Sequence, residues 1–207
     1  MIRRLRETTA IAAVALMTVG VGIGLSAAGA GQAAGAPAPK PPAKPAGASS
    51  TAATVARGKY LVTIAVCNDC HTPFKMGDNG PEPDMSRMLS GHPADMTLPP
   101  PPQASGPWIV SGAATFTAWS GPWGISYTAN LTPDKETGLG TWTAQQFIDT
   151  IRNGRVQGHG RQLLPPMPWA WYRNMTDSDL RAVFAYLQTI PAVKNKVPDP
   201  VLAPPAK

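Results

Sequence analysis

Cysteine, histidine and charge are all scarce in this chain of 207 residues, which has 2 Cys, 3 His and 14% charged residues. A structural zinc site takes four ligands from such side chains, so zinc would have to recruit scattered histidines. From Thr54 to Lys207, thirteen Lys and Arg stand against eleven Asp and Glu, and most of the total charge of +6 lies before Thr54. Nucleic-acid binding needs a basic face on the folded domain, and this near-balance argues against it.

Residues 1–33 have the pattern of an export signal. Three arginines within the first six residues precede an uncharged apolar run, and Ala28 and Ala30 offer a cleavage site. The alternative is an uncleaved membrane anchor at residues 10–30, which is just long enough to span a bilayer. Either interpretation predicts a periplasmic location, free or tethered to the outer face of the inner membrane.

The remaining chain divides by composition into three parts. Residues 34–53 are rich in Ala and Pro and lack large apolar side chains, so we expect an extended linker. Residues 54–193 carry the helical patterns and motifs and are the predicted domain. Residues 194–207 are polar and Pro-rich, and we expect a flexible tail there.

The two cysteines stand in the stretch Cys67-Asn68-Asp69-Cys70-His71. A Cys-x-x-Cys-His sequence is typical of covalent haem attachment, because two thiols can form thioethers to the porphyrin while the adjacent imidazole reaches the iron. A disulfide or a redox dithiol also uses Cys-x-x-Cys outside the cytosol. The adjacent His71 favours haem.

Three helices are predicted from apolar spacing and capping residues. The first begins at a Thr54 cap and runs into the cysteines, and Gly58 inside it indicates a close approach by another element. The second has a capping box at Thr143 and ends at Gly154. The third begins at a Thr176 cap with acidic residues in its first turn.

A long segment from residue 75 to 122 contains many prolines, which disfavour a long helix or a central strand. We therefore expect a Pro-rich loop insertion, with at most one helical turn at residues 84–89 behind an Asp84 cap. A loop of this length is expected to be functional or to pack over something, such as a large apolar cofactor.

The ligand opposite His71 decides between electron transfer and ligand chemistry. Met167 is the leading candidate, because neighbouring prolines stiffen the loop that presents it. Its alternative role is core filling, the commoner fate of methionine. His159 and His92 are rivals, although each is expected to be a solvent-exposed loop histidine.

Taken together, these features resemble the class I c-type cytochromes. The resemblance covers residues 55–193 and includes the haem motif, the Met167 loop, and a last helix whose Tyr186 would pack on Gly58. The resemblance is closer to the cytochrome domains that accept electrons from periplasmic alcohol or gluconate dehydrogenases. Segments 129–134, 137–140 and 167–169 of this chain resemble the corresponding segments of those domains. The resemblance implies an all-α class I cytochrome c fold around one covalent haem c.

Further contacts to the haem are expected from this resemblance. A proline carbonyl, for which Pro122 is the candidate, would accept a hydrogen bond from His71. Asn130, Trp142 and Arg155 could bond the haem propionates, or could be ordinary capping, packing and surface residues. Five arginines gather around the Met167 loop and form either a docking rim for an acidic redox partner or a solvated face; they are Arg152, Arg155, Arg161, Arg173 and Arg181.

The sequence thus predicts an electron carrier rather than an enzyme. It would pass single electrons between a dehydrogenase, an oxidase or another cytochrome through a His71/Met167-ligated haem iron. A second hypothesis is a haem enzyme or sensor with an open or weakly held sixth position. A third is a thiol oxidoreductase that uses Cys67 and Cys70 without haem.

Overall fold

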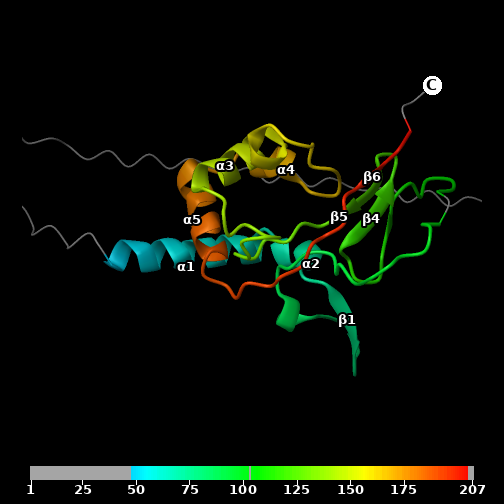
Figure 1. Ribbon diagram of the computed structural model, residues 1–207, viewed down its shortest axis with the longest axis horizontal. Coiled ribbons are helices and arrows are strands. Elements are labelled where there is room, and N and C mark those ends of the chain that lie inside the picture. The colour runs from blue at the N-terminus through cyan, green and yellow to red at the C-terminus, as the bar shows by residue number, and fades with distance from the viewer. Residues whose placement is uncertain (1–47, 103, 205–207) are drawn as a thin grey trace, which may run out of the picture. The chain divides into compact units, whose positions relative to one another are not determined.

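The computed structural model describes residues 48–102 and 104–204 (Figure 1). The predicted export signal or anchor and residues 34–47 of the linker lie outside this part. Within it, no helix is both long enough and apolar enough to cross a membrane. The helices are α1 (Ala48–Ile64), α2 (Cys67–His71), α3 (Ala144–Asn153), α4 (Trp169–Tyr172) and α5 (Asp177–Leu187), with short 3-10 helices at Met85–Arg87 and Val156–Gly158.

Helices α1 and α5 cross in close contact at Gly58 (Figure 1). A Cβ atom added to Gly58 would lie 1.9 Å from the carbonyl oxygen of Ala182 and 2.8 Å from the Cβ of Tyr186. Only glycine allows the two backbones to approach this closely. The predicted contact between Gly58 and Tyr186 is confirmed.

The start of α1 differs from the sequence prediction. The helix begins at Ala48, so the expected Thr54 cap lies inside it and the linker is shorter than residues 34–53. The last proline before the helix is Pro45, and the alanines, serines and threonine that follow it can all continue a helix.

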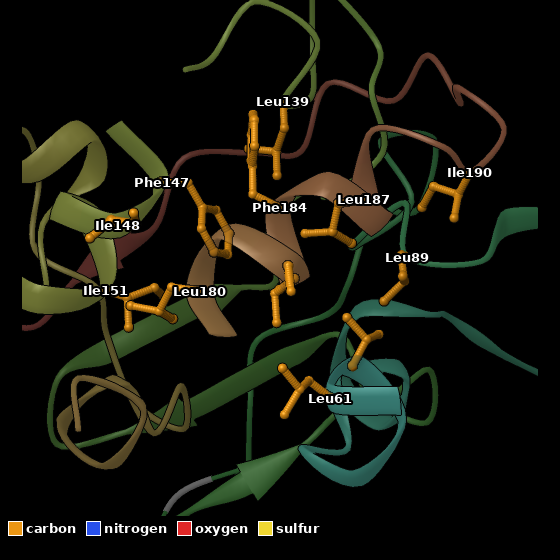
Figure 2. Packing of buried hydrophobic residues seen from close by; sticks show 13 residues of the cluster. Leu61, Leu89, Leu139, Phe147, Ile148, Ile151, Leu180, Phe184, Leu187 and Ile190 are labelled. Atoms are coloured by element: carbon orange, nitrogen blue, oxygen red, sulfur yellow. The ribbon is translucent and has the colours of Figure 1, made fainter. Parts of the chain in front are cut away.

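Helices α3 and α5 have the predicted caps. Thr143 Oγ1 accepts from the backbone N–H of Gln146, whose side chain accepts from the backbone N–H of Thr143, and Gly154 ends α3 in the left-handed conformation. Thr176 Oγ1 likewise accepts from the N–H of Asp179. Both helices turn their apolar faces into one core, shown in Figure 2; labelled members include Leu61, Leu89, Phe147, Ile151, Leu180, Phe184, Leu187 and Ile190.

The all-α fold prediction is wrong, because the described residues form two antiparallel sheets, and most of their strands come from the Pro-rich segment. The first is a hairpin of β1 (Phe74–Gly77) and β2 (Gly80–Pro83), and the second has the strand order β3-β4-β5-β6. Its strands are β3 (Ser111–Gly112), β4 (Ala118–Gly121), β5 (Gly124–Tyr127) and β6 (Val201–Leu202). The prolines fall in the two-stranded hairpin, in which every strand is an edge, or outside the strands. The predicted turn capped by Asp84 is present.

The prediction of a flexible tail from residue 194 is also wrong for the described residues, which reach 204. Residues 188–200 run from the end of α5 towards the second sheet, where β6 pairs with β5 (Figure 1). Asn195 anchors this segment, because its buried side-chain amide donates to the carbonyls of Ser90 and His92, and its Oδ1 accepts from the N–H of Ala94. The C-terminal segment is therefore part of the domain.

Candidate haem site

A cavity of about 520 Å³ lies between the helices, β5 and the Met167 loop. This volume is in the range of protein sites for cofactors and other small molecules. Residues 196–200 of the C-terminal segment also line it. Apolar side chains dominate the wall, among them Leu61, Val62, Leu131, Leu139, Phe147, Ile151, Leu163, Val183 and Leu187.

Cys67 and Cys70 both line this cavity and are not joined by a disulfide. They belong to α2, the single helical turn that the left-handed backbone of Val66 separates from α1. Positions i, i+3 and i+4 of a helix share one face, so α2 places both thiols and the His71 ring together. Burial raises the pKa of Cys67 to about 11, and burial also raises the pKa of Cys70. Protonated thiols are poor nucleophiles, which argues against the thiol oxidoreductase.

His71 is held in one orientation at the wall of the cavity. Its side chain is 8% exposed, and Nδ1 lies 2.8 Å from the carbonyl oxygen of Ala129. With its proton on Nδ1, the ring donates to this carbonyl and leaves Nε2 available for a metal. Burial lowers the pKa of His71, which favours the neutral ring that metal binding requires. The prediction of Pro122 as this acceptor is wrong, since Ala129 occupies the position.

Met167 lies half-buried on the same cavity, as a sixth ligand would. Of the described methionines, one other lines the cavity, Met175, which the sequence did not single out. Neither of the two rival histidines lines the cavity. His159 is exposed as expected, but His92 is fully buried, with Nδ1 2.9 Å from Thr117 Oγ1 and no part in the cavity wall.

The expected propionate contacts are only partly supported. Asn130 lines the cavity, but its amide donates to the carbonyl of Val193 and its Oδ1 accepts from Thr132, so its side chain already has structural partners. Trp142 lines the cavity and no hydrogen bond of its indole occurs in the described part of the chain. Lys196 also lines it, and no sequence signal marked that residue in the C-terminal segment.

The five arginines do not form a single cluster at the cavity. Arg152 pairs with Asp177, and Arg155 donates to the carbonyl of Gly160 and does not line the cavity, so the propionate role predicted for Arg155 is not supported. Arg161 is the arginine of this group that lines the cavity, and it is exposed. The two cationic side chains at the cavity are therefore Arg161 and Lys196.

The family model for cytochrome c matches residues 55–191. The chain belongs to the cytochrome c family. It is 30% identical over 165 residues to the fructose dehydrogenase cytochrome subunit of Gluconobacter japonicus, which covers 77% of this chain and 27% of that subunit. It is 31% identical over 134 residues to the gluconate 2-dehydrogenase cytochrome c subunit of Pantoea cypripedii, covering 65% of this chain and 22% of the relative.

A third relative is the cytochrome c subunit of the quinone alcohol dehydrogenase of Gluconobacter oxydans, 29% identical over 71% of this chain and 24% of the subunit. The chain thus spans about a quarter of the length of these relatives. The resemblance to dehydrogenase cytochrome subunits is confirmed. Family membership implies a covalently bound haem c, and two unpaired thiols beside a neutral, oriented imidazole on an apolar cavity fit that group.

Proposed function

We propose that this chain is an electron-transfer cytochrome that carries single electrons through one haem c. The observation that carries the proposal is the placement of Cys67, Cys70, His71 and Met167 on one apolar cavity. Its relatives are cytochrome subunits, the electron-carrying parts of dehydrogenase complexes. When bound, haem c supplies an iron that alternates between the ferrous and ferric states.

The side chains of the domain each have a defined role in this proposal. Cys67 and Cys70 would hold the cofactor covalently, and the hydrogen bond of His71 Nδ1 to the Ala129 carbonyl would leave Nε2 free to bind the metal. Met167 would supply a soft thioether as the second ligand, which would favour the ferrous state and raise the reduction potential compared with two histidines. The apolar wall would keep water from the metal and would also raise the reduction potential.

We further propose a dehydrogenase subunit as the electron donor. The named relatives belong to fructose, alcohol and gluconate dehydrogenases, and this chain shares their cytochrome domain. Arg161 and Lys196 would lie at the rim of the bound cofactor, where positive charge can steer an acidic partner. Increasing ionic strength should then slow the bimolecular reduction by an acidic donor, and Arg161→Glu should slow it further.

We propose a periplasmic location, on the basis of the arginines and apolar run in residues 1–33. Fractionation of cells that express the full chain tests this and separates the alternatives. A cleaved signal predicts a shortened protein in the periplasmic fraction, and a retained anchor predicts the full-length protein in the membrane fraction. Recovery of full-length protein in the cytoplasm would contradict both.

The function is tested on the full haem-loaded protein by a spectroscopic redox titration. An electron carrier should titrate reversibly with one electron, remain low-spin in both states and bind carbon monoxide only slowly. The haem enzyme or sensor with an open sixth position predicts a high-spin spectrum and rapid carbon monoxide binding. That result, or turnover with peroxide, would overturn the proposal.

A further inference from the structure

The Met167 loop has few backbone hydrogen bonds of its own. Pro165, Pro166 and Pro168 have no N–H to donate, and the N–H of Met167 reaches only the carbonyl of Leu164 at 3.2 Å. The position of the thioether therefore depends on contacts from outside the loop. Two side chains, Ser126 and Tyr172, supply such contacts.

Ser126 of β5 holds the loop from the side of the sheet. Its buried Oγ donates to the carbonyl of Pro165 at 2.6 Å, much closer than its other possible acceptor, the Trp119 carbonyl, at 3.4 Å. The indole N–H of Trp123 donates to the same Oγ at 3.3 Å, which leaves the hydroxyl proton for Pro165. This bond fixes the loop two residues before Met167.

Tyr172 anchors α4, the helix that directly follows the Met167 loop. Its hydroxyl donates to the carbonyl of Ala65 at 2.5 Å. Ala65 lies two residues before Cys67, so this bond joins the helix that follows Met167 to the segment that leads into the haem motif. Tyr172 is half-buried and lines the cavity.

The hydrogen bond of Ser126 also connects the two predicted iron ligands, His71 and Met167, through the segment 126–129. Three residues beyond Ser126, the carbonyl of Ala129 accepts from His71. The short stretch from Ser126 in β5 to Ala129, two residues after the strand ends, thus contacts the Met167 loop at one end and the His71 ring at the other. A shift of the loop relative to His71 has to break the Ser126 bond.

We propose that Ser126 and Tyr172 are positioning residues that hold Met167 at the sixth coordination position. The proposal rests on the proposed function, in which Met167 is the sixth ligand. Neither side chain needs to touch the metal. Each restricts the departure of the loop, and so each limits access of an external ligand to the ferric iron.

The test is the affinity of imidazole for the full ferric holoprotein, because imidazole can bind only when the methionine leaves. Ser126→Ala and Tyr172→Phe should each raise this affinity about five-fold, the factor expected for one lost hydrogen bond. The double variant should approach the product of the two. The far-red methionine-to-iron band should weaken in each single variant and weaken further in the double variant. It should be absent in Met167→Ala.

The chain offers a matched control for each change. Ser90 is fully buried and its Oγ has no partner in the described structure, so Ser90→Ala removes a hydroxyl without removing a hydrogen bond. The half-buried Tyr186 makes no hydrogen bond through its hydroxyl in that same part of the chain, and Tyr186→Phe matches Tyr172→Phe. Both controls should bind imidazole with the affinity of the wild type.

General destabilisation is tested with Ile190→Ala, a core change away from the cavity. If imidazole affinity follows the free energy of unfolding in all variants, including this one, the positioning role is wrong. The same conclusion follows if Ser126→Ala and Tyr172→Phe behave like their controls while the wild type keeps its far-red band. A wild type without that band would instead overturn the proposed function itself.

Discussion

Gly58→Ala tests the crossing of α1 and α5, on which the position of the haem motif in α2, directly after α1, depends. The new Cβ would lie 1.9 Å from the Ala182 carbonyl oxygen, and the obstacle is backbone that cannot rotate away. Alanine gains about 1 kcal/mol in helix propensity over glycine. Overpacking a tight contact costs about 1–3 kcal/mol or more. Because the overlap is severe, we expect a net loss of about 1–2 kcal/mol in the free energy of unfolding.

The assay is denaturant unfolding of the holoprotein followed by far-UV circular dichroism. Ala56→Gly, on an exposed position of the same helix, is the control and should cost about 1 kcal/mol through propensity alone. If Gly58→Ala instead stabilises the protein by the propensity gain, α1 and α5 do not approach at this residue and the account of the crossing is refuted.

Three further predictions concern parts of the domain beyond this crossing. Asn195→Ala should lower the free energy of unfolding by about 3 kcal/mol or more, because it leaves buried backbone groups without partners, and a loss below 1 kcal/mol would contradict the anchoring role. Ile190→Ala should cost about 2–5 kcal/mol in the same assay, and a neutral result would show that the core is not packed as described. The hydrogen bond from Arg57 lowers the pKa of Asp179, so this pair stabilises the fold above the ordinary carboxyl value of 3.8 and loses its effect as the pH falls through the lowered pKa. Asp179→Asn should therefore be less stable than the wild type at pH 7 and equal to it in strong acid, and a difference that grows towards low pH would contradict the reasoning.

Local patterns predicted the bounds of α3 and α5 well. The capping box at Thr143, the stop at Gly154 and the Thr176 cap depend on neighbouring residues, and all three are present. The glycine at position 58 also indicated the helix crossing, because a glycine inside an otherwise regular helix has a packing reason.

The strands could not be predicted in the same way. All six described strands are two to four residues long, too short for an alternating pattern to be recognised, and β6 pairs with β5 across a long separation in the sequence. The buried role of Asn195 depends on carbonyl groups about a hundred residues away. Such non-local hydrogen bonds leave no local signal.

In the candidate site, too, local features could be predicted from the sequence and non-local contacts could not. The haem motif and the Met167 loop were visible in the sequence because each is a short continuous segment. The carbonyl of Ala129 was not, since any residue has a carbonyl and only the path of the chain after β5 brings this one to His71. Lys196 similarly reaches the cavity through tertiary structure alone, and the sequence indicated Arg161 only as one of five arginines around the Met167 loop.

The central claim is that Met167 completes the coordination of a haem iron held by His71. It is tested most directly by the absorption spectrum of the full ferric holoprotein, compared with Met167→Ala and with Met175→Ala, the other cavity methionine. We predict a low-spin wild type with a weak far-red band that disappears in Met167→Ala and persists in Met175→Ala. A high-spin wild type, or a band that survives the loss of Met167, would contradict the account.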